Sequence, residues 1–343
     1  MLFATYHKKN KDTLKGFMNA FLTQKVENTH IPLANTALQR LRDFAVRGKL
    51  LRGGFVMFSH EMFANSSGDD VLRVACAMEI SQSAVLIHDD IMDNDRTRRG
   101  YPSLYAQYES DALETNRENA QEYGKSMGLV VGDIGLFLPY ELLGDVVANP
   151  EVKAQIMIVY SHVMTYLGIG QMLDYEYATS EHEQTGEEIQ AMYSLKTGSY
   201  TFTLPFVLGA ILAGASEPDI SLLKEITYHL GIVFQIKDDE LDLYGDVEKT
   251  GKPQGSDIKE GKKTLIRSAL SEILTADELA SLPARPIQEV QELIEKHGIK
   301  EKLDVQVEEH SRLAREGVAK LNTTDEFKEL FLDLIQYNEK RNT

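Results

Sequence analysis

Two groups of aspartates are the residues in this sequence best suited to bind a divalent cation. They are Asp89, Asp90 and Asp93 in "DDIMD", and Asp238, Asp239 and Asp242 in "DDELD". Carboxylates four residues apart share a helix face, where like charges cost about 0.2–0.5 kcal/mol per pair. Acids near the C-terminus of a helix also oppose its dipole. Both groups therefore predict bound cations, and Mg²⁺ fits because it combines carboxylate oxygens with water and ligand phosphates.

Basic residues accompany both aspartate groups and predict that anions bind there. They lie beside glycines in "RGKLLRGG", "DRTRRG", "YSLKTGSY" and "KTGKPQGSDIKEGKKT". Arginine binds phosphate through paired hydrogen bonds, lysine acts as a point charge, and glycine lets backbone N–H groups approach phosphate. Each residue alone could be an ordinary surface charge. Their repetition predicts two anion pockets, one built through metal ions and one by direct charge.

Composition narrows the possible functions. The chain has 343 residues and a formal net charge of -17, which disfavours nucleic acid as a partner. One cysteine, Cys76, excludes an internal disulfide and a thiolate metal cage, and it favours a reducing, cytoplasmic location. No secretory signal is evident. The apolar stretch from Leu204 to Ala215 is too short for a membrane span, so we expect a buried helix and no stable membrane insertion.

Long apolar helices must position the two aspartate groups. The periodicity predicts one helix over 70–93, with Asp70 as a possible cap, and another over 221–246. Each of these helices ends in acids. The polar stretch 109–123 is predicted to be an exposed excursion. Because strand patterns are scarce and no Pro-, Gly- or Ser-rich linker divides the chain, we expect a single all-α domain over residues 1–343.

The order of the motifs resembles that of the trans-isoprenyl diphosphate synthases, the polyprenyl synthetase family. The motifs run from about Gly48 to Lys263: "GKLLRG", "DDIMDNDRTRRG", "GQMLD", "LKTG" and "FQIKDDELDLYGDVEKTGK…SDIKEGKKT". This resemblance implies an all-α helical bundle around a deep hydrophobic cavity, in a homodimer. It also implies Mg²⁺-dependent, head-to-tail joining of isopentenyl diphosphate to an allylic diphosphate, which would be dimethylallyl, geranyl or farnesyl diphosphate.

The resemblance also implies roles for individual residues. About three Mg²⁺ ions, for which Mn²⁺ could substitute, would be held by the six aspartates. The allylic diphosphate would contact Arg98, Lys196 and Lys252, and Lys262 matches the lysine that follows the second aspartate motif's loop. Isopentenyl diphosphate would contact Lys49, Arg52, Gln82 and Arg99. Thr197 and Gln235 would line the reacting allylic carbon, supported by Gln171 and Asp174. Lys196, Thr197, Gln235 and Arg98 would thus be the catalytic residues.

The implied chemistry needs no nucleophile. Metal ions and basic residues stabilise the departing diphosphate, and a dry cavity protects the allylic cation from water. Two positions depart from the family pattern. Leu50 replaces a common arginine, and Gly53 replaces a common proline.

Small residues before the first aspartate group bear on product length. Ser81, Ala84 and Val85 would line the cavity, where farnesyl-making relatives commonly carry an aromatic residue at the Ala84 or Val85 position. This pattern predicts C20 geranylgeranyl diphosphate, with a longer polyprenyl product or farnesyl diphosphate as alternatives. A class I terpene cyclase and a non-catalytic subunit of a heteromeric synthase are the competing functions. The isopentenyl-binding residues argue against the first and the intact aspartates against the second.

Overall fold

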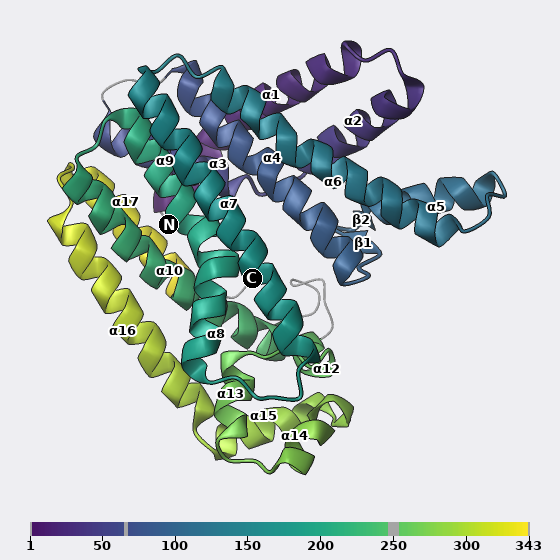
Figure 1. The fold of residues 1–343 in the computed structure, drawn as a ribbon. Coiled ribbons are helices and arrows are strands. Elements are labelled where there is room, and N and C mark those ends of the chain that lie inside the picture. Colours follow the sequence, from purple (N-terminus) through teal and green to yellow (C-terminus); the bar gives the residue numbers. More distant parts are fainter. Residues whose placement is uncertain (1, 65–67, 246–253, 342–343) are drawn as a thin grey trace. The chain divides into compact units, whose positions relative to one another are not determined.

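The computed structural model describes residues 2–64, 68–245 and 254–341. These residues form helices and one short ribbon, in which β1 (Thr97–Arg98) pairs antiparallel with β2 (Tyr101–Pro102) (Figure 1). The predicted all-α class is confirmed. Packing divides the chain into two compact units, and the single domain expected over residues 1–343 stays a prediction. Unit 1 comprises Met1–Phe3, Ile158–Val207 and Ala215–Thr343, and unit 2 comprises Ala4–Met157 and Leu208–Gly214.

Unit 2 is built around the helix that ends in the first aspartate group. Its helices are α1 (Leu2–Glu27), which begins in unit 1, α2 (Pro32–Ala45), α3 (Leu51–Phe63), α4 (Asp69–Met92), α5 (Leu104–Glu114) and α6 (Ala120–Gly144). α4 packs against α3 and α6, and α6 packs against α5 (Figure 1). The predicted helix over 70–93 is confirmed as α4. Gly68 rather than Asp70 is its N-cap, and Asp70 instead accepts hydrogen bonds from Arg73 and the backbone N–H of Val147.

Glycines on α6 allow it to approach α4 closely. A Cβ atom added at Gly128 would lie 2.8 Å from Ile91, and one added at Gly135 would lie 2.9 Å from the Cβ of Ala84. At Gly132 the added atom would overlap the ring of His88. The Cβ of Ala84 cannot swing aside, so Gly135 needs to be glycine, whereas at the other two positions the neighbouring side chain would have to move. The close contact fixes the rotation of α4, and with it the direction in which the first aspartates point.

Unit 1 holds the second aspartate group on its longest helix, α10 (Glu217–Tyr244). The other elements wholly in unit 1 are α8 (Gly186–Tyr193), η1 (Ser194–Thr203), α12 (Ser256–Lys259), α13 (Leu265–Ser271), α14 (Ala276–Ser281), η2 (Leu282–Ala284), α15 (Ile287–Lys296), α16 (Ile299–Lys320) and α17 (Asp325–Glu339). α10 packs against η1, α16 and α17 (Figure 1). The predicted helix over 221–246 is confirmed as α10, within a few residues at each end. α7 (Pro150–Thr179) and α9 (Leu204–Ala213) each contain residues of both units.

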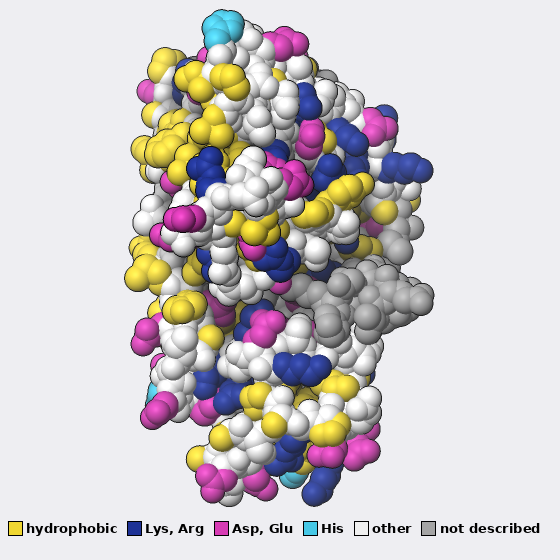
Figure 2. Space-filling model, turned by 90° about the vertical axis from the view of Figure 1, so that its right-hand side faces the viewer, with side chains coloured by type: hydrophobic (Ala, Val, Ile, Leu, Met, Phe, Trp, Pro, Cys, Tyr) yellow, Lys and Arg dark blue, Asp and Glu magenta, His cyan; other side chains and the backbone are white. Residues whose placement is uncertain are grey.

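The expected absence of stable membrane insertion stays a prediction. Three helices, α4, α6 and α7, are long and apolar enough to do so by length and composition. Their best windows are 67%, 44% and 22% buried, respectively. Scattered polar residues interrupt each apolar run but leave its average hydropathy high, so the unbroken run sought in the sequence was too strict a criterion. Acidic and basic side chains are interspersed over the face shown in Figure 2.

Candidate active site

The first aspartate group lies at the C-terminal end of α4. Asp90 is buried, whereas Asp93 caps the helix and is exposed. Arg98 in β1 donates from Nε to Asp90 Oδ1 at 2.6 Å and from a terminal nitrogen to Asp95 at 3.0 Å. Burial raises the pKa of Asp90 to about 6, with Asp89 and Asp95 adding to the rise and Arg98 opposing it. The buried Asp90 Oδ2 has no hydrogen-bond partner among the described residues, so this carboxylate fits a site that also receives a cation.

Arg99 points toward a different part of unit 2. It has a left-handed backbone (φ 56°), so its side chain departs from that of its neighbour Arg98. Its guanidinium donates to the carbonyl of Phe44 at 3.3 Å and lies 5.4 Å from the Phe44 ring centroid. A Cβ added at Gly48 would meet the same guanidinium at 3.3 Å. The structure therefore brings Arg99 against the turn that leads to Lys49 and Arg52.

That turn joins α2 to α3 and is set by a left-handed residue, Leu50 (φ 56°), immediately before the first residue of α3. The Leu50 side chain is buried. Arg52 follows in the first turn of α3, and the carbonyl of Lys49 contacts a ring nitrogen of His7 at 2.9 Å. Three of the four residues predicted for isopentenyl diphosphate therefore gather around one end of α3.

The fourth, Gln82, is half-buried on α4. Val85 and Asp89 follow it on the same helix face and are also half-buried. Ala84 is fully buried against Gly135 of α6, and Ser81 is buried with its hydroxyl donating to the carbonyl of Ala77. Of the three predicted chain-length residues, only Val85 is not fully buried in the packing of unit 2.

In unit 1, Lys196 and Thr197 lie on η1, a ten-residue π-helix. π-helical turns are uncommon and often occur at functional sites. Lys196 Nζ forms an ion pair with the carboxylate of Asp174 on α7. α7 can approach this closely because a Cβ at Gly170 would overlap the backbone of Lys196. Asp174, which was predicted to support the site from a neighbouring helix, thus contacts Lys196 directly.

The aspartates of α10 have three different environments. Asp238 is exposed and pairs with Arg341 at 3.1 Å. Asp239 is buried and accepts a hydrogen bond from the hydroxyl of Tyr193, which itself accepts one from the backbone N–H of Leu265. Burial raises the pKa of Asp239 well above its usual value.

Asp242 contacts the first residues of α12. It accepts hydrogen bonds from the hydroxyl of Ser256 and from the backbone N–H of Asp257, the latter at 3.2 Å. Lys262 pairs with Asp257 and Glu260, each at 3.1 Å. Gln235 is half-buried on α10, three residues before Asp238. Lys252, predicted to bind the allylic diphosphate, lies outside the described residues.

Within the described ranges, no group of three or more His, Cys, Asp or Glu side chains is arranged to hold a metal ion unaided. This fits Mg²⁺, which is commonly bound through one or two carboxylates, with substrate phosphates completing its shell. The aspartates that present accessible oxygens are Asp89, Asp93 and Asp238, because their side chains are only partly buried or exposed.

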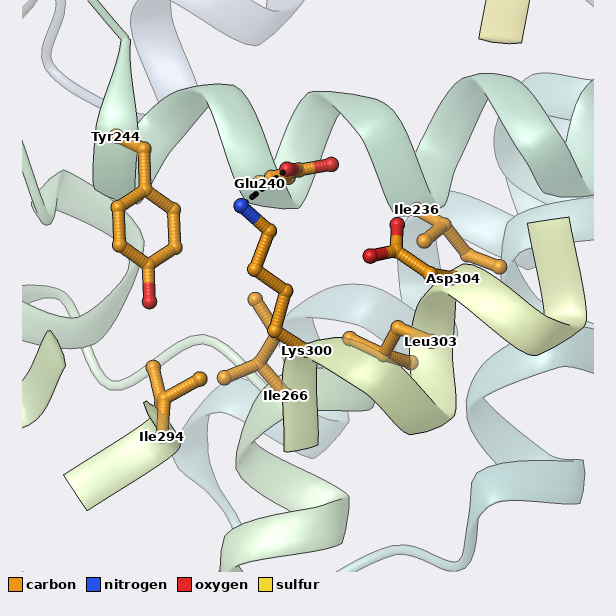
Figure 3. Close-up of a pocket in the computed structure, with 8 residues that line it drawn as sticks. All are labelled: Ile236, Glu240, Tyr244, Ile266, Ile294, Lys300, Leu303 and Asp304. Atoms are coloured by element: carbon orange, nitrogen blue, oxygen red, sulfur yellow. Dashed lines mark ion pairs between the residues drawn. The ribbon is translucent and has the colours of Figure 1, made fainter. Parts of the chain in front are cut away.

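A small, shallow hollow in unit 1 is lined by none of the predicted site residues. Four aliphatic side chains form its floor, and Glu240, Lys300, Asp304 and Tyr244 surround it (Figure 3). Lys300 pairs with Glu240 at 3.4 Å, and Lys237 bridges Glu240 and Asp304. These ion pairs join α10 to α16, and we assign the hollow to that packing.

Sequence reasoning missed two buried polar residues beside the predicted sites. Tyr193 holds Asp239, and Glu79 of α4 accepts a hydrogen bond from the backbone N–H of Gly53 at 2.7 Å. Glu79 had a visible signal, because it is the only charged residue between Arg73 and Asp89 except for His88. Tyr193 had no such signal in the sequence, because a tyrosine near the end of an apolar helix is not unusual.

Comparisons with known proteins identify the family of this chain. A family profile described as Polyprenyl synthetase matches residues 35–295. A short chain isoprenyl diphosphate synthase of Methanocaldococcus jannaschii is 34% identical over 219 residues, which span 64% of this chain and 61% of that protein. One from Methanothermobacter thermautotrophicus is 31% identical over 288 residues, 81% of this chain and 82% of that protein.

Solved structures share the fold over nearly the whole chain. A geranylgeranyl pyrophosphate synthase from Corynebacterium glutamicum, complexed with isoprenyl diphosphate and magnesium, superposes with a TM-score of 0.89 at 26% identity. The match covers 97% of this chain and 99% of that structure. A geranylgeranyl pyrophosphate synthetase from Pyrococcus horikoshii matches with a TM-score of 0.82, also at 26% identity, over 99% of this chain and 98% of that one.

Proposed function

Because the chain belongs to the polyprenyl synthetase family, we propose that it is a Mg²⁺-dependent prenyltransferase that condenses isopentenyl diphosphate head to tail with an allylic diphosphate. The observation that carries this proposal is the divergence of two adjacent arginines. Arg98 pairs with the first aspartate group, whereas Arg99 turns to the Lys49–Arg52 segment. An enzyme with one diphosphate substrate needs only an arginine beside the aspartates. A second basic pocket that lacks aspartates suits a second diphosphate, bound without metal ions.

The donor set on the aspartate side fits Mg²⁺. Asp89, Asp93 and Asp238 would hold the ions, about three per site, and Mn²⁺ would substitute because it also accepts oxygen ligands. Bound Mg²⁺ would neutralise the charge that develops on the departing diphosphate. Asp90 would support the ions from its buried position. Asp239 and Asp242 are already engaged by protein donors, so we assign them an indirect role, through water or through their neighbours.

The remaining residues would bind, orient and protect the reactants. Arg98, Lys196, Lys252 and Lys262 would bind the allylic diphosphate, with Lys196 held in place by Asp174. Thr197 and Gln235 would face the allylic carbon and stabilise positive charge there with their oxygens. Lys49, Arg52, Gln82 and Arg99 would bind isopentenyl diphosphate. The double bond then attacks the allylic carbon as its bond to diphosphate breaks, and the departing diphosphate accepts the proton released from the new chain.

We propose geranylgeranyl diphosphate as the product. Val85 is small and half-buried one turn before Asp89, so a growing chain that starts at the aspartates meets no aromatic side chain there. Primers would be dimethylallyl, geranyl or farnesyl diphosphate. A longer polyprenyl product is the alternative, because a small residue at this position admits a longer chain as readily.

We further propose a homodimer that works in the cytoplasm without inserting into a membrane. α6 carries four exposed large apolar side chains, Leu129, Val130, Phe137 and Tyr140, whose spacing places them on one side of the helix. A second copy of the chain packed on this stripe would remove the apolar side chains from water. It would leave no backbone N–H or C=O group unpaired, because α6 satisfies its own. Hydrophobic side chains also gather along the left edge of the view in Figure 2.

Purified protein with isopentenyl diphosphate, farnesyl diphosphate and Mg²⁺ tests the reaction. We expect a C20 product and one diphosphate per condensation, both abolished by a chelator. Asp89→Asn and Asp238→Asn should lower kcat by at least about 100-fold without unfolding the protein. Diphosphate release without isopentenyl diphosphate would instead indicate a terpene cyclase. No release under any condition would indicate a non-catalytic subunit.

A further inference from the structure

Glu79 is a carboxyl group in the apolar interior of unit 2. It lies in the middle of α4 and is 4% exposed, and its neighbours Met78 and Ile80 are fully buried. An ionised carboxylate in such a position is costly unless hydrogen bonds and opposite charges compensate for the lost water. A leucine at this position would avoid that cost. The contacts of Glu79 therefore indicate which groups compensate for the buried charge.

Glu79 first holds the beginning of α3. Its Oε1 accepts the backbone N–H of Gly53 at 2.7 Å, and the backbone N–H of Arg52 also donates to this carboxyl. The first N–H groups of a helix have no partner within the helix, so a carboxylate there both satisfies them and complements the helix dipole. Gly53 sits flush on α4, because an added Cβ would lie 3.1 Å from Glu79 and 2.9 Å from the carbonyl of Ala75. Glu79 thereby fixes the position from which the Arg52 side chain departs.

The Glu79 carboxyl also interacts electrostatically with two arginines, Arg52 and Arg99, whose like charges oppose each other. Burial raises the pKa of Glu79, and the charges of Arg52 and Arg99 oppose that rise. Burial lowers the pKa of Arg99. Glu79 opposes this, the positive charges of Arg98 and Arg52 lower the pKa further, and Asp90 raises it. Arg52 and Arg99 reach this place from α3 and from the loop after β1, and Glu79 is the acidic group that both face.

We infer that Glu79 is a positioning residue for the isopentenyl diphosphate pocket, a buried counter-ion that fixes the start of α3 and lets Arg52 and Arg99 converge on one diphosphate. The inference rests on the proposed function. Without the negative charge, the two guanidiniums would separate or draw in a solvent anion. The aspartate group and its metal ions lie at the far end of α4, more than two helical turns from Glu79, so the allylic substrate should be affected little.

Glu79→Gln is the direct test, because it keeps the shape and the acceptor for Gly53 but removes the charge. The ratio of KM for isopentenyl diphosphate to KM for farnesyl diphosphate should rise more than about fivefold, with the thermal midpoint nearly kept. Ser83→Ala is the matched control. Ser83 is equally buried on the same helix, donates to the carbonyl of Glu79 at 2.9 Å, and should leave the ratio unchanged.

Direct binding separates this inference from the proposed function. Calorimetric titration with isopentenyl diphosphate in the absence of Mg²⁺ should show weaker binding to Glu79→Gln than to the unaltered protein. If the unaltered protein binds and turns over isopentenyl diphosphate but Glu79→Gln keeps the same KM ratio, or raises both KM values equally, the role of Glu79 is overturned. If the unaltered protein neither binds nor reacts, the proposed function fails, and this inference with it.

A second variant covers the case in which Glu79→Gln does not fold. Glu79→Asp keeps the charge and draws it back from α3 by one methylene group. The KM ratio should then rise more than about twofold. An unchanged ratio in this folded variant would equally overturn the inference.

Discussion

Each aspartate motif contains one buried carboxylate held by a protein donor, directly after an aspartate that is less buried. Asp90 is held by Arg98, and Asp239 by Tyr193. Asp89 and Asp238 precede them by one residue and point outward. This division follows from helix geometry, because consecutive residues lie about 100° apart and cannot both face the core. Identical residue types in one motif therefore have different roles.

At the residue scale, Val85→Phe should shorten the product. The phenyl ring would occupy the face that Val85 shares with Gln82 and Asp89, and chromatography of the products should show C15 or shorter chains in place of C20. Ala84→Phe is the comparison, because its ring would meet Gly135 of α6. We expect that variant to lose about 1–3 kcal/mol of stability through overpacking. Unchanged C20 product from a folded Val85→Phe would contradict the assignment.

At the element scale, the approach of α7 to η1 depends on one glycine. Gly170→Ala would push a methyl group into the backbone of Lys196, so we expect a loss of about 1–3 kcal/mol in the free energy of unfolding and a reduced kcat. Gly168 on the same helix has open space around it. Gly168→Ala should be neutral or stabilising by up to about 1 kcal/mol. Denaturant unfolding of both variants checks this, and equal effects would contradict the packing argument.

Two histidines link α10 to α16 and make that contact sensitive to pH. The Nδ1 atoms of His229 and His310 lie 2.8 Å apart, so one must donate and the other accept. Burial lowers the pKa of both from the ordinary value of 6.5, although Glu309 opposes this for both and Glu225 for His229. The unfolded chain therefore binds more protons than the native protein below about pH 6.5. The stabilising contact is complete above that pH and is lost as the pH falls.

The corresponding measurement is the urea midpoint at about pH 7.5 and about pH 5.5 for the unaltered protein and for His310→Gln. The unaltered protein should lose more stability on acidification than the variant does. Contributions from all other titrating groups are common to both proteins and cancel in the comparison. An equal loss in the two proteins would show that the histidine pair is not a source of the pH dependence.

At the scale of the whole molecule, the apolar stripe of α6 predicts self-association. Phe137 is 70% exposed, the largest fraction among the aromatic side chains of the described residues. Phe137→Asp should convert the dimer to a monomer, as measured by light scattering during size exclusion. Val305→Asp on α16 is the control, since Val305 is 66% exposed but stands outside this stripe. A monomeric unaltered protein, or a dimer that survives Phe137→Asp, would contradict the proposal.

The sequence by itself determined the family, the all-α class and the two aspartate helices. These properties depend on local order: carboxylates four residues apart, apolar periodicity, and basic residues beside glycines all lie within short segments. The same local patterns predicted α4 and α10 to within a few residues. They gave the wrong N-cap for α4, because the carboxylate of Asp70 accepts hydrogen bonds from Arg73 and from the backbone N–H of Val147, which is distant in the sequence.

Only the tertiary structure determined the direction in which each predicted side chain points. Glycines on α6 fix the rotation of α4, which buries Ala84 against Gly135 and leaves Val85 half-buried. A left-handed backbone at Arg99 sends it away from Arg98, and the buried charge of Glu79 lies beneath the turn that Arg99 reaches. Each outcome depends on segments distant in the sequence that meet in space, and neither periodicity nor motif spacing contains that information.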